Sequence, residues 1–310
     1  MSGSSSNPLP FPVIMGPTAS GKTALALEIA RSMDGEIISA DSMQIYRGLD
    51  IGTAKPTQEE RREIPHHLID IVEMTEKYDV FRFVDEAEKC LIRIRSGGHL
   101  PIVAGGSGLY LRALIYGLDP MPSDPALRME IDRKFDSDEH FPELCAMMEK
   151  ADPEDLARFA ANRRKLLRAW EVFQLSGQPM VRLQERWKNT PPRHDARSFL
   201  LVWDPAVLKQ RIRERCQAML KAGWIEEAEH FLHAGLNRAP TAWQVLGYRE
   251  IAAYLAGTIS RTDLPERIAT ATWQFARRQN TWFRTQHPEA LRIPMPSPAA
   301  ETIIRKITEK

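Results

Sequence analysis

The segment that most constrains the fold is residues 16–23, GPTASGKT, which matches the phosphate-binding P-loop pattern at every fixed position. An apolar run at 11–15 predicts a strand before it, and residues 22–33 predict a helix after it. In this context backbone N–H groups converge on phosphate oxygens, and the helix N-terminus adds its positive end. The sequence therefore predicts a site for a di- or triphosphate group, although the loop alone does not identify the reaction. The residues of this site are Gly16, Pro17, Thr18, Ala19, Ser20, Gly21, Lys22 and Thr23.

The first third of the chain alternates short apolar runs with amphipathic segments. Besides residues 11–15, strands are predicted at 36–40, 68–72 and 100–104, with a helix at 80–95. Strands that alternate with helices indicate a parallel sheet covered on both faces. The expected fold class is α/β, a P-loop NTPase-like parallel sheet with flanking helices and a mostly helical insertion domain.

A change in the sequence pattern near residue 119, from alternating strands and helices to a proline-rich segment followed by helices, predicts the domain organisation. Pro120, Pro122 and Pro125 indicate a linker, residues 127–187 are predominantly helical in pattern, and Pro191-Pro192 closes that segment. A strand predicted at 198–203 returns the chain to the core, and the remainder is helical in pattern. We expect three parts: 1–118 as the first part of the P-loop core, 119–196 as a helical insertion, and 197–310 as the return to the core and a helical C-terminal part.

Composition excludes several classes of protein. Hydrophobic residues make up 43% of the 310 residues and charged residues 27%, as expected of a folded chain, and the net charge is only +1. Cys90, Cys145 and Cys216 fit neither a zinc spacing nor a disulfide framework. The start, MSGSSSNPLP, lacks the features of a signal peptide, and no long apolar run predicts a membrane span. We expect a cytoplasmic protein and, because nothing indicates an obligate dimer, a monomer.

Two further features follow predicted strands. Asp41 ends the second strand, at the sheet edge where ligands bind in open parallel sheets. Its carboxylate can hold Mg²⁺ or accept a proton from a nucleophile, and the alternative is that it only caps a following helix. The segment 105–110, GGSGLY, brings backbone amides and the Ser107 hydroxyl to the same edge, or is simply a tight turn. In the P-loop, Lys22 supplies a cation and Thr23 a hydroxyl ligand for Mg²⁺.

Basic residues gather in two segments. Residues 158–197 contain ten Lys or Arg against three acids, and 277–284, RRQNTWFR, interleaves cations with aromatic and amide side chains. Such surfaces suit RNA phosphates and exposed bases, although a charge run is often only a solvated face. His66 and His67 lack further predicted ligands for a metal, so a structural role is expected for them.

Taken together, the blocks of this sequence resemble the tRNA dimethylallyltransferase (tRNA isopentenyltransferase) family in its bacterial form. The resemblance runs from about residue 11 to residue 284. Its six blocks occur in the family's order: GPTASGKT at 16–23, ADSMQIYRGLDIGTAKP at 40–56, GGSGLYL at 105–111, NRRKLLRAWE at 162–171, GYRE at 247–250 and RRQNTWFR at 277–284.

The resemblance implies transfer of a dimethylallyl group from dimethylallyl pyrophosphate, with Mg²⁺, to N6 of the adenosine 3′ of the anticodon in tRNAs that read codons beginning with U. Asp41 would take the N6 proton, and Ser107 stands where the family usually has Thr. The implied catalytic set is Asp41, Ser107, Lys22 and Arg215, and Arg211 and Arg215 would join the P-loop in holding pyrophosphate, unless they are ordinary surface arginines. The implied tRNA contacts are Asp41, Ser42, Met43, Gln44, Ser107, Arg128, Arg164, Lys165, Leu166, Leu167, Arg168, Gly247, Tyr248, Arg249, Arg277, Arg278, Gln279, Trp282 and Arg284.

Two other functions are compatible with a P-loop. A nucleoside or small-metabolite kinase shares the sheet and the P-loop, but it needs neither the ADSMQIY segment at 40–46 nor the block at 277–284. A nucleotide-gated RNA-binding protein would bind RNA without transferring a group. A mass shift of one five-carbon unit on tRNA would distinguish all three functions.

Overall fold

The computed structural model describes residues 9–118, 121–186, 190–239 and 241–309. Outside these residues lie 1–8, the predicted boundary at Asp119, Pro120, the predicted helix end at Trp187 and the cation Lys188, as well as the side chain of Arg186. The chain divides into two compact units. Unit 1 comprises residues 1–115 and 192–310, and unit 2 comprises residues 116–191.

Unit 1 is built on a six-stranded sheet in the order β3-β2-β4-β1-β5-β6, and every strand pair is parallel. In chain order the strands are β1 (Phe11–Met15), β2 (Gly35–Ser39), β3 (His66–His67), β4 (Leu100–Gly105), β5 (Ala196–Trp203) and β6 (Leu291–Met295). Because all strands run the same way, the segments that follow β2, β4 and β1 emerge side by side at one edge. The predicted α/β fold class is confirmed.

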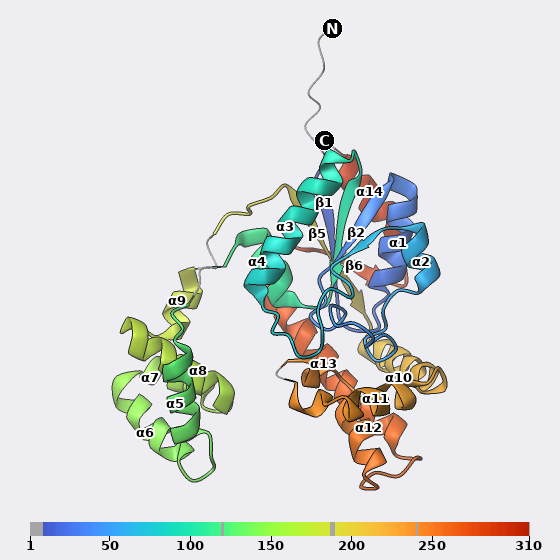
Figure 1. Ribbon diagram of the computed structural model, residues 1–310. Helices are drawn as coiled ribbons and strands as arrows, with labels where there is room; N and C mark the ends of the chain where they lie inside the picture. Colours follow the sequence, from blue (N-terminus) through green and yellow to red (C-terminus); the bar gives the residue numbers. More distant parts are fainter. Residues whose placement is uncertain (1–8, 119–120, 187–189, 240, 310) are drawn as a thin grey trace. The chain divides into compact units, whose positions relative to one another are not determined.

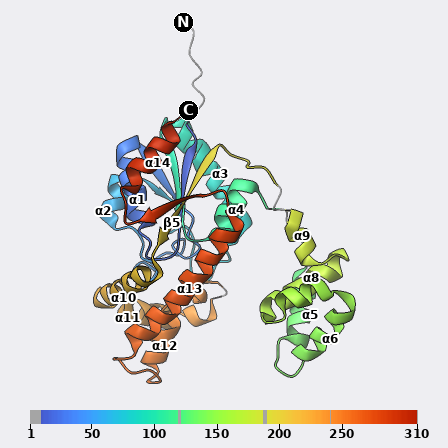
Figure 2. The same cartoon turned by 180° about the vertical axis from the view of Figure 1, so that it is seen from behind.

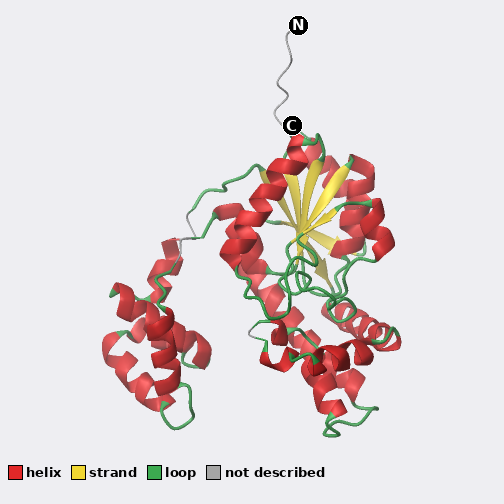
Figure 3. Ribbon diagram, viewed as in Figure 1, coloured by secondary structure: helices red, strands yellow, loops and turns green. Residues whose placement is uncertain are grey.

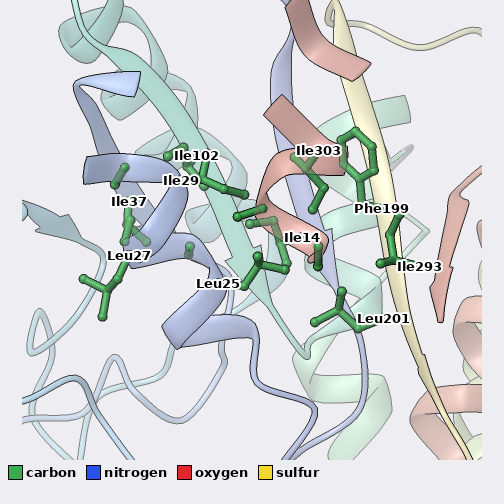
Figure 4. Close-up of a cluster of buried hydrophobic side chains, with 14 of the residues drawn as sticks. Ile14, Leu25, Leu27, Ile29, Ile37, Ile102, Phe199, Leu201, Ile293 and Ile303 are labelled. Atoms are coloured by element: carbon green, nitrogen blue, oxygen red, sulfur yellow. The ribbon is translucent and has the colours of Figure 1, made fainter. Parts of the chain in front are cut away.

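Helices cover both faces of this sheet (Figures 1 and 2). One face is covered by α1 (Lys22–Met33) and α14 (Ala299–Thr308), and the other by α3 (Val80–Ser96) and α4 (Gly108–Tyr116). Figure 4 shows the core under α1 and α14, where Ile14 and Phe199 of the sheet meet Ile29 and Ile303 of the helices. These four side chains are at most 1% exposed, which fixes the sheet and the helix that follows the P-loop as one rigid body.

The third predicted strand is wrong in position. Residues 68–72 form no strand; β3 is the dipeptide His66–His67. Leu68 and Asp70 have left-handed φ angles of 61° and 56°, a conformation that a strand does not tolerate. The side chains of His66 and His67 bond to the Ile64 carbonyl and to the Glu36 carboxylate, which supports their structural role.

The chain beyond residue 290 contains a strand that the sequence reasoning missed. It assigned the whole segment after residue 205 to helices, but β6 adds an edge strand to β5 before α14 begins. Burial along β6 is weak, because of its five residues only Ile293 is buried. A strand that buries one side chain carries little periodic signal, so it was missed.

A group of helices lies beyond the carboxyl ends of the strands (Figures 1 and 3). It comprises α10 (Pro205–Lys221), α11 (Trp224–His233), α12 (Tyr248–Leu255) and the long α13 (Leu264–Gln286), with short 3₁₀ turns at Leu236–Arg238 and Ala242–Gln244. The short α2 (Gln58–Glu63) precedes β3. These helices therefore border the sheet edge at which ligands bind in open parallel sheets.

Unit 2 is a separate helical body with its own core. It contains α5 (Pro125–Phe135), α6 (Phe141–Ala151), α7 (Pro153–Phe159), α8 (Arg163–Ser176) and α9 (Met180–Arg186). Leu144, Met148, Leu166 and Leu167 are among its buried side chains, each at most 1% exposed. Within the part of the chain that the structure describes, no helix has both the length and the apolarity needed to cross a bilayer.

Candidate active site at the carboxyl edge of the sheet

The P-loop joins β1 to α1 in a conformation that leaves its amides available. Ala19 and Gly21 have φ angles of 62° and 91°, and the Ser20 amide donates to the Pro17 carbonyl at 3.3 Å, so the chain turns tightly before the helix. Gly21 is the N-cap of α1, and no side chain of the described residues caps that end. An uncapped helix N-terminus behind a tight turn is a ready anion site.

Lys22 folds back over this loop. Its Nζ donates to the Pro17 carbonyl at 2.7 Å and lies 3.5 Å from Ser20 Oγ. Burial lowers the pKa of Lys22 to about 7, Asp41 opposes that lowering, and Arg215 adds to it. Lys22, Asp41 and Arg215 therefore act on one another through a single electrostatic site, in which an anion would restore the charge of the lysine.

Asp41 follows β2 and belongs to a turn. Its Oδ1 accepts from the Met43 amide at 2.9 Å, and the next helix begins only at Gln58. The alternative that Asp41 caps a following helix is therefore wrong. The Ser107 hydroxyl accepts from the Ser42 amide at 2.9 Å, and the Ser107 amide donates to the Ala40 carbonyl at 3.2 Å. These bonds hold the Asp41 turn against the glycine-rich turn after β4.

Glycine is required in that second turn by close packing. A Cβ on Gly105 would lie 2.0 Å from the Ala40 carbonyl oxygen, and one on Gly108 would lie 2.1 Å from the Trp282 ring. The Gln279 side chain spans from this turn to the P-loop: its Oε1 accepts from the Thr18 amide at 2.8 Å, and its Nε2 donates to the Gly106 carbonyl at 2.9 Å. Gln279 thus ties this turn to the P-loop.

Arg211 and Arg215 approach the P-loop from α10. Arg211 Nε donates to the Ala19 carbonyl at 3.1 Å, and its guanidinium stacks 4.3 Å from the Trp203 ring. Trp203 Nε1 donates in turn to the Ser20 carbonyl at 3.0 Å. Burial lowers the pKa of Arg215, and the negative charge of Asp41 partly opposes this lowering. Neither residue is an ordinary surface arginine, in contrast to Arg213, which pairs with Glu266 at 2.9 Å.

One pocket adjoins the P-loop, and a second, larger pocket shares part of its lining. The smaller has a volume of about 30 Å³, and its lining combines Thr18 and Ala19 of the P-loop with apolar side chains that include Ile212, Met219 and Leu246. The larger, of about 430 Å³, lies between α10 and the segment 50–61. Arg215 and Met219 line both pockets. A phosphate-binding loop therefore has apolar space directly beside it.

The loop at 50–52, which borders both pockets, is held by Glu227. The Glu227 carboxylate accepts from the amides of Asp50, Ile51 and Gly52 at 2.7–2.9 Å and from the Tyr248 hydroxyl at 2.5 Å. The sequence reasoning did not single out Glu227. Its only signal was the acidic first turn of α11, a common feature of surface helices.

The residues implied as RNA contacts in unit 1 fall into three groups. Arg277, Arg278, Arg284 and Arg249 are exposed, whereas Tyr248 and Gln279 are buried. Trp282 is partly exposed and packs on Gly108, and a Cβ on Gly247 would lie 2.2 Å from Trp224. Ser42, Met43 and Gln44 are partly exposed beside Asp41. In the block at 277–284 the arginines are therefore exposed to solvent, whereas the Gln279 amide is buried and the Trp282 ring packs on Gly108.

In unit 2 the implied RNA contacts are similarly divided. Arg164 and Lys165 are exposed on α8, whereas the side chains of Leu166 and Leu167 belong to the core. Arg168 pairs with Glu171 at 2.6 Å, and Arg128 lies 3.6 Å from the same carboxylate. Glu171 is 1% exposed, so these two cations neutralise a buried charge.

A magnesium ion would find oxygen ligands at this site. Thr23 lies in the first turn of α1 with its side chain partly exposed, and Asp41 follows β2 at the same edge of the sheet. Among the described residues no group of three or more His, Cys, Asp or Glu side chains is arranged to hold a metal ion. The donor set therefore fits an ion that takes most of its ligands from phosphate and water, as Mg²⁺ does.

Comparisons with known proteins agree on one family. Residues 44–286 match the family model described as IPP transferase. A tRNA dimethylallyltransferase of Deinococcus radiodurans is 40% identical over 305 residues, which cover 97% of each chain. One from Thermus thermophilus is 40% identical over 285 residues and 92% of each chain.

Solved structures point the same way. The tRNA isopentenylpyrophosphate transferase of Bacillus halodurans superposes with a TM-score of 0.69 at 32% identity, over 97% of this chain and 95% of that one. A eukaryotic dimethylallyltransferase acting on tRNA superposes with a TM-score of 0.76 at 26% identity, over 93% of this chain and 74% of that one.

Proposed function

The chain belongs to the IPP transferase family, and from this premise we propose that it is an enzyme that transfers a dimethylallyl group from dimethylallyl pyrophosphate to tRNA. The acceptor atom in the proposal is N6 of the adenosine 3′ of the anticodon, in tRNAs that read codons beginning with U. The observation that carries the proposal is the sheet edge at which a P-loop, the Asp41 carboxylate and an apolar pocket adjoin.

The P-loop and its cations would bind the leaving group. As the bond between C1 of the prenyl group and oxygen breaks, its electron pair leaves with pyrophosphate, where negative charge grows. The amides of the first turn of α1, the Lys22 ammonium and the guanidinium groups of Arg211 and Arg215 stand ready to stabilise that charge. Donors positioned beforehand act most strongly on the transition state. A magnesium ion held by Thr23 would supply further positive charge to pyrophosphate when bound.

Asp41 is the proposed general base. The adenosine N6 forms a bond to C1 and becomes positively charged, and it then loses a proton to the Asp41 carboxylate. The bond from the Met43 amide fixes the Oδ1 side of that carboxylate, and the Ser107 hydroxyl, held by the Ser42 amide, stabilises the same turn. A carboxylate that is held rigid loses little entropy when the adenine arrives.

The apolar lining of the smaller pocket is the proposed contact surface for the five-carbon group. A P-loop reads phosphate oxygens and not what they carry, so the preference for a prenyl donor must come from its surroundings. Ile212, Met219 and Leu246 supply apolar surface beside Thr18 and Ala19. A nucleotide would have to place a ribose in this lining, with few partners for its hydroxyl groups.

RNA would be bound by the exposed cations of both units. In unit 1 these are Arg277, Arg278 and Arg284 on α13, and in unit 2 they are Arg164 and Lys165 on α8. An anticodon stem-loop offers many phosphates to such cations. The target adenosine must leave its stacked position to reach Asp41, and this costs least in a single-stranded loop.

The mass of an RNA product tests this function. Incubation with dimethylallyl pyrophosphate, Mg²⁺ and an anticodon stem-loop should add one C₅H₈ unit to the RNA, and replacement of the target adenosine by inosine, which lacks the N6 amine, should abolish the addition. The kinase alternative is not supported by the relatives of this chain. Rapid phosphoryl transfer from ATP without RNA, together with an unmodified stem-loop, would nevertheless establish it.

A further inference from the structure

The pocket beside the P-loop and the larger pocket meet at one face of α10. The smaller takes Ile212 and Cys216 from this helix, the larger takes Ala218 and Ala222, and both take Arg215 and Met219. At about 3.6 residues per turn these positions follow one another around the helix in a fixed order. That order is Ala218, Ala222, Arg215, Met219, Ile212, Cys216. Arg215 and Met219, one turn apart, therefore form the boundary between the two pockets.

The two boundary residues differ in chemistry. Arg215 carries a guanidinium, which suits the pyrophosphate end of a donor. Met219 carries no charge, and its unbranched thioether chain fills space between apolar neighbours. The part of the boundary that a hydrocarbon chain would meet is therefore Met219.

The larger pocket can accept hydrocarbon beyond that boundary. Its lining contains Ile51, Ala54, Pro56 and Ala218. Its charged lining residues are largely neutralised: Lys55 Nζ lies 2.6 Å from Asp50 and 2.5 Å from Asp70, and Arg61 lies 2.6 Å from Asp70. Paired charges at the rim leave the apolar lining to determine what the pocket binds.

We propose that Met219 sets the length of the prenyl donor. Its side chain lies between the apolar lining at which we place the five-carbon group and the larger pocket, and that pocket, of about 430 Å³, would hold the second isoprene unit of a ten-carbon donor if Met219 were shortened. The proposal rests on the proposed function, because it takes the smaller pocket as the prenyl site. The chemistry is unchanged: the C1–O bond of geranyl pyrophosphate breaks, the N6–C1 bond forms, and pyrophosphate leaves.

The test compares Met219→Ala with wild type on both donors. With an anticodon stem-loop and geranyl pyrophosphate, Met219→Ala should add one C₁₀H₁₆ unit with kcat/KM at least about tenfold above wild type, since each apolar group a pocket admits or rejects changes discrimination by at least that factor. Transfer from dimethylallyl pyrophosphate by the same variant shows that it is folded. Met219→Val, a milder truncation, should give an intermediate gain.

Two control variants test whether the gain comes from opening the boundary between the two pockets or only from enlarging one of them. Leu246→Ala enlarges the smaller pocket without reaching the larger one, so it should not gain use of geranyl pyrophosphate. Ala218→Leu narrows the larger pocket and, combined with Met219→Ala, should remove the gain. The proposal is overturned if Leu246→Ala gains as much as Met219→Ala. It is also overturned if neither Met219 variant uses the longer donor while the urea unfolding curves of both variants show that they are folded. Failure of wild type to use dimethylallyl pyrophosphate would instead reject the proposed function.

Discussion

At the scale of single residues, Asp41 is the group whose replacement separates chemistry from donor binding. Asp41→Asn keeps the size of the side chain and an oxygen for the Met43 amide, but it removes the basic carboxylate. The transfer rate in a single turnover should fall by roughly 10²–10⁴-fold, the usual contribution of a general base, while pyrophosphate affinity stays close to that of wild type.

The matched control for Asp41 lies at the other end of the same strand. Asp34 is exposed and precedes β2, and its left-handed φ of 49° is a conformation that Asn readily adopts, so Asp34→Asn should transfer at the wild-type rate. A rate within about threefold of wild type for Asp41→Asn would contradict the assignment of the base.

Lys22 gives a second prediction at this scale, because its pKa is lowered to about 7 from 10.5. Between these values the unfolded chain holds a proton that the folded protein has released, so this group's contribution to the free energy of unfolding rises with pH across that window. Bound pyrophosphate favours the charged lysine. Its affinity should therefore fall as the pH rises above 7, by up to about tenfold per pH unit, with proton uptake on binding.

Calorimetry in two buffers with different ionisation heats measures this uptake. Lys22→Arg keeps its charge throughout, so it should show no uptake assigned to this side chain. The titration of pyrophosphate itself is common to both proteins and cancels in the comparison. Equal proton uptake by wild type and Lys22→Arg would rule out a neutral Lys22 in the free protein.

At the scale of secondary-structure elements, Gln279 connects α13 to the P-loop and to the turn after β4. Gln279→Leu retains volume but leaves the Thr18 amide and the Gly106 carbonyl without their partner. Each unpaired group costs about 1–3 kcal/mol, so urea unfolding should show a loss of that order in the free energy of unfolding.

The neighbouring residue provides the control for this bridge. Asn280 is exposed, so Asn280→Leu should change the free energy of unfolding by less than about 0.5 kcal/mol. If Gln279 served only to contact RNA, Gln279→Leu would unfold like wild type and lose RNA affinity alone. That result would refute the bridging role.

At the scale of the whole molecule, the cations of unit 2 divide into two kinds that mutation can distinguish. The exposed pair on α8, changed together as Arg164→Ala and Lys165→Ala, should leave stability near wild type. RNA binding should weaken, and its log–log salt slope should flatten by about 0.7–0.9 for each RNA phosphate that is left without a cation.

Arg168→Ala, in contrast, should act on folding. It removes the closer cation from the buried Glu171 carboxylate and should lower the free energy of unfolding by at least about 2 kcal/mol. If the double variant keeps the RNA affinity and salt slope of wild type, the exposed cations of α8 do not contact RNA. If Arg168→Ala is as stable as wild type, Arg128 alone is enough to neutralise Glu171.

The local content of the sequence determined much of this protein. GPTASGKT after an apolar run specifies a strand, a tight turn and an uncapped helix N-terminus, because each depends on neighbouring residues only. The helices at 22–33 and 80–95 follow from apolar spacing, and the structure has them at Lys22–Met33 and Val80–Ser96. The six ordered blocks were enough to identify the family, which the comparisons confirm.

Tertiary structure alone decided which side chains meet. An excess of cations counted within residues 158–197 overlooks acids from elsewhere: Arg163 pairs with Asp138, Arg182 with Glu154, and Arg193 with Glu88. The left-handed turns at Leu68 and Asp70, the burial of Gln279 and the boundary at Met219 likewise depend on segments far apart in the chain. Ion pairs, burial and pocket linings depend on contacts between residues that are distant in the sequence. A local sequence pattern therefore cannot predict them.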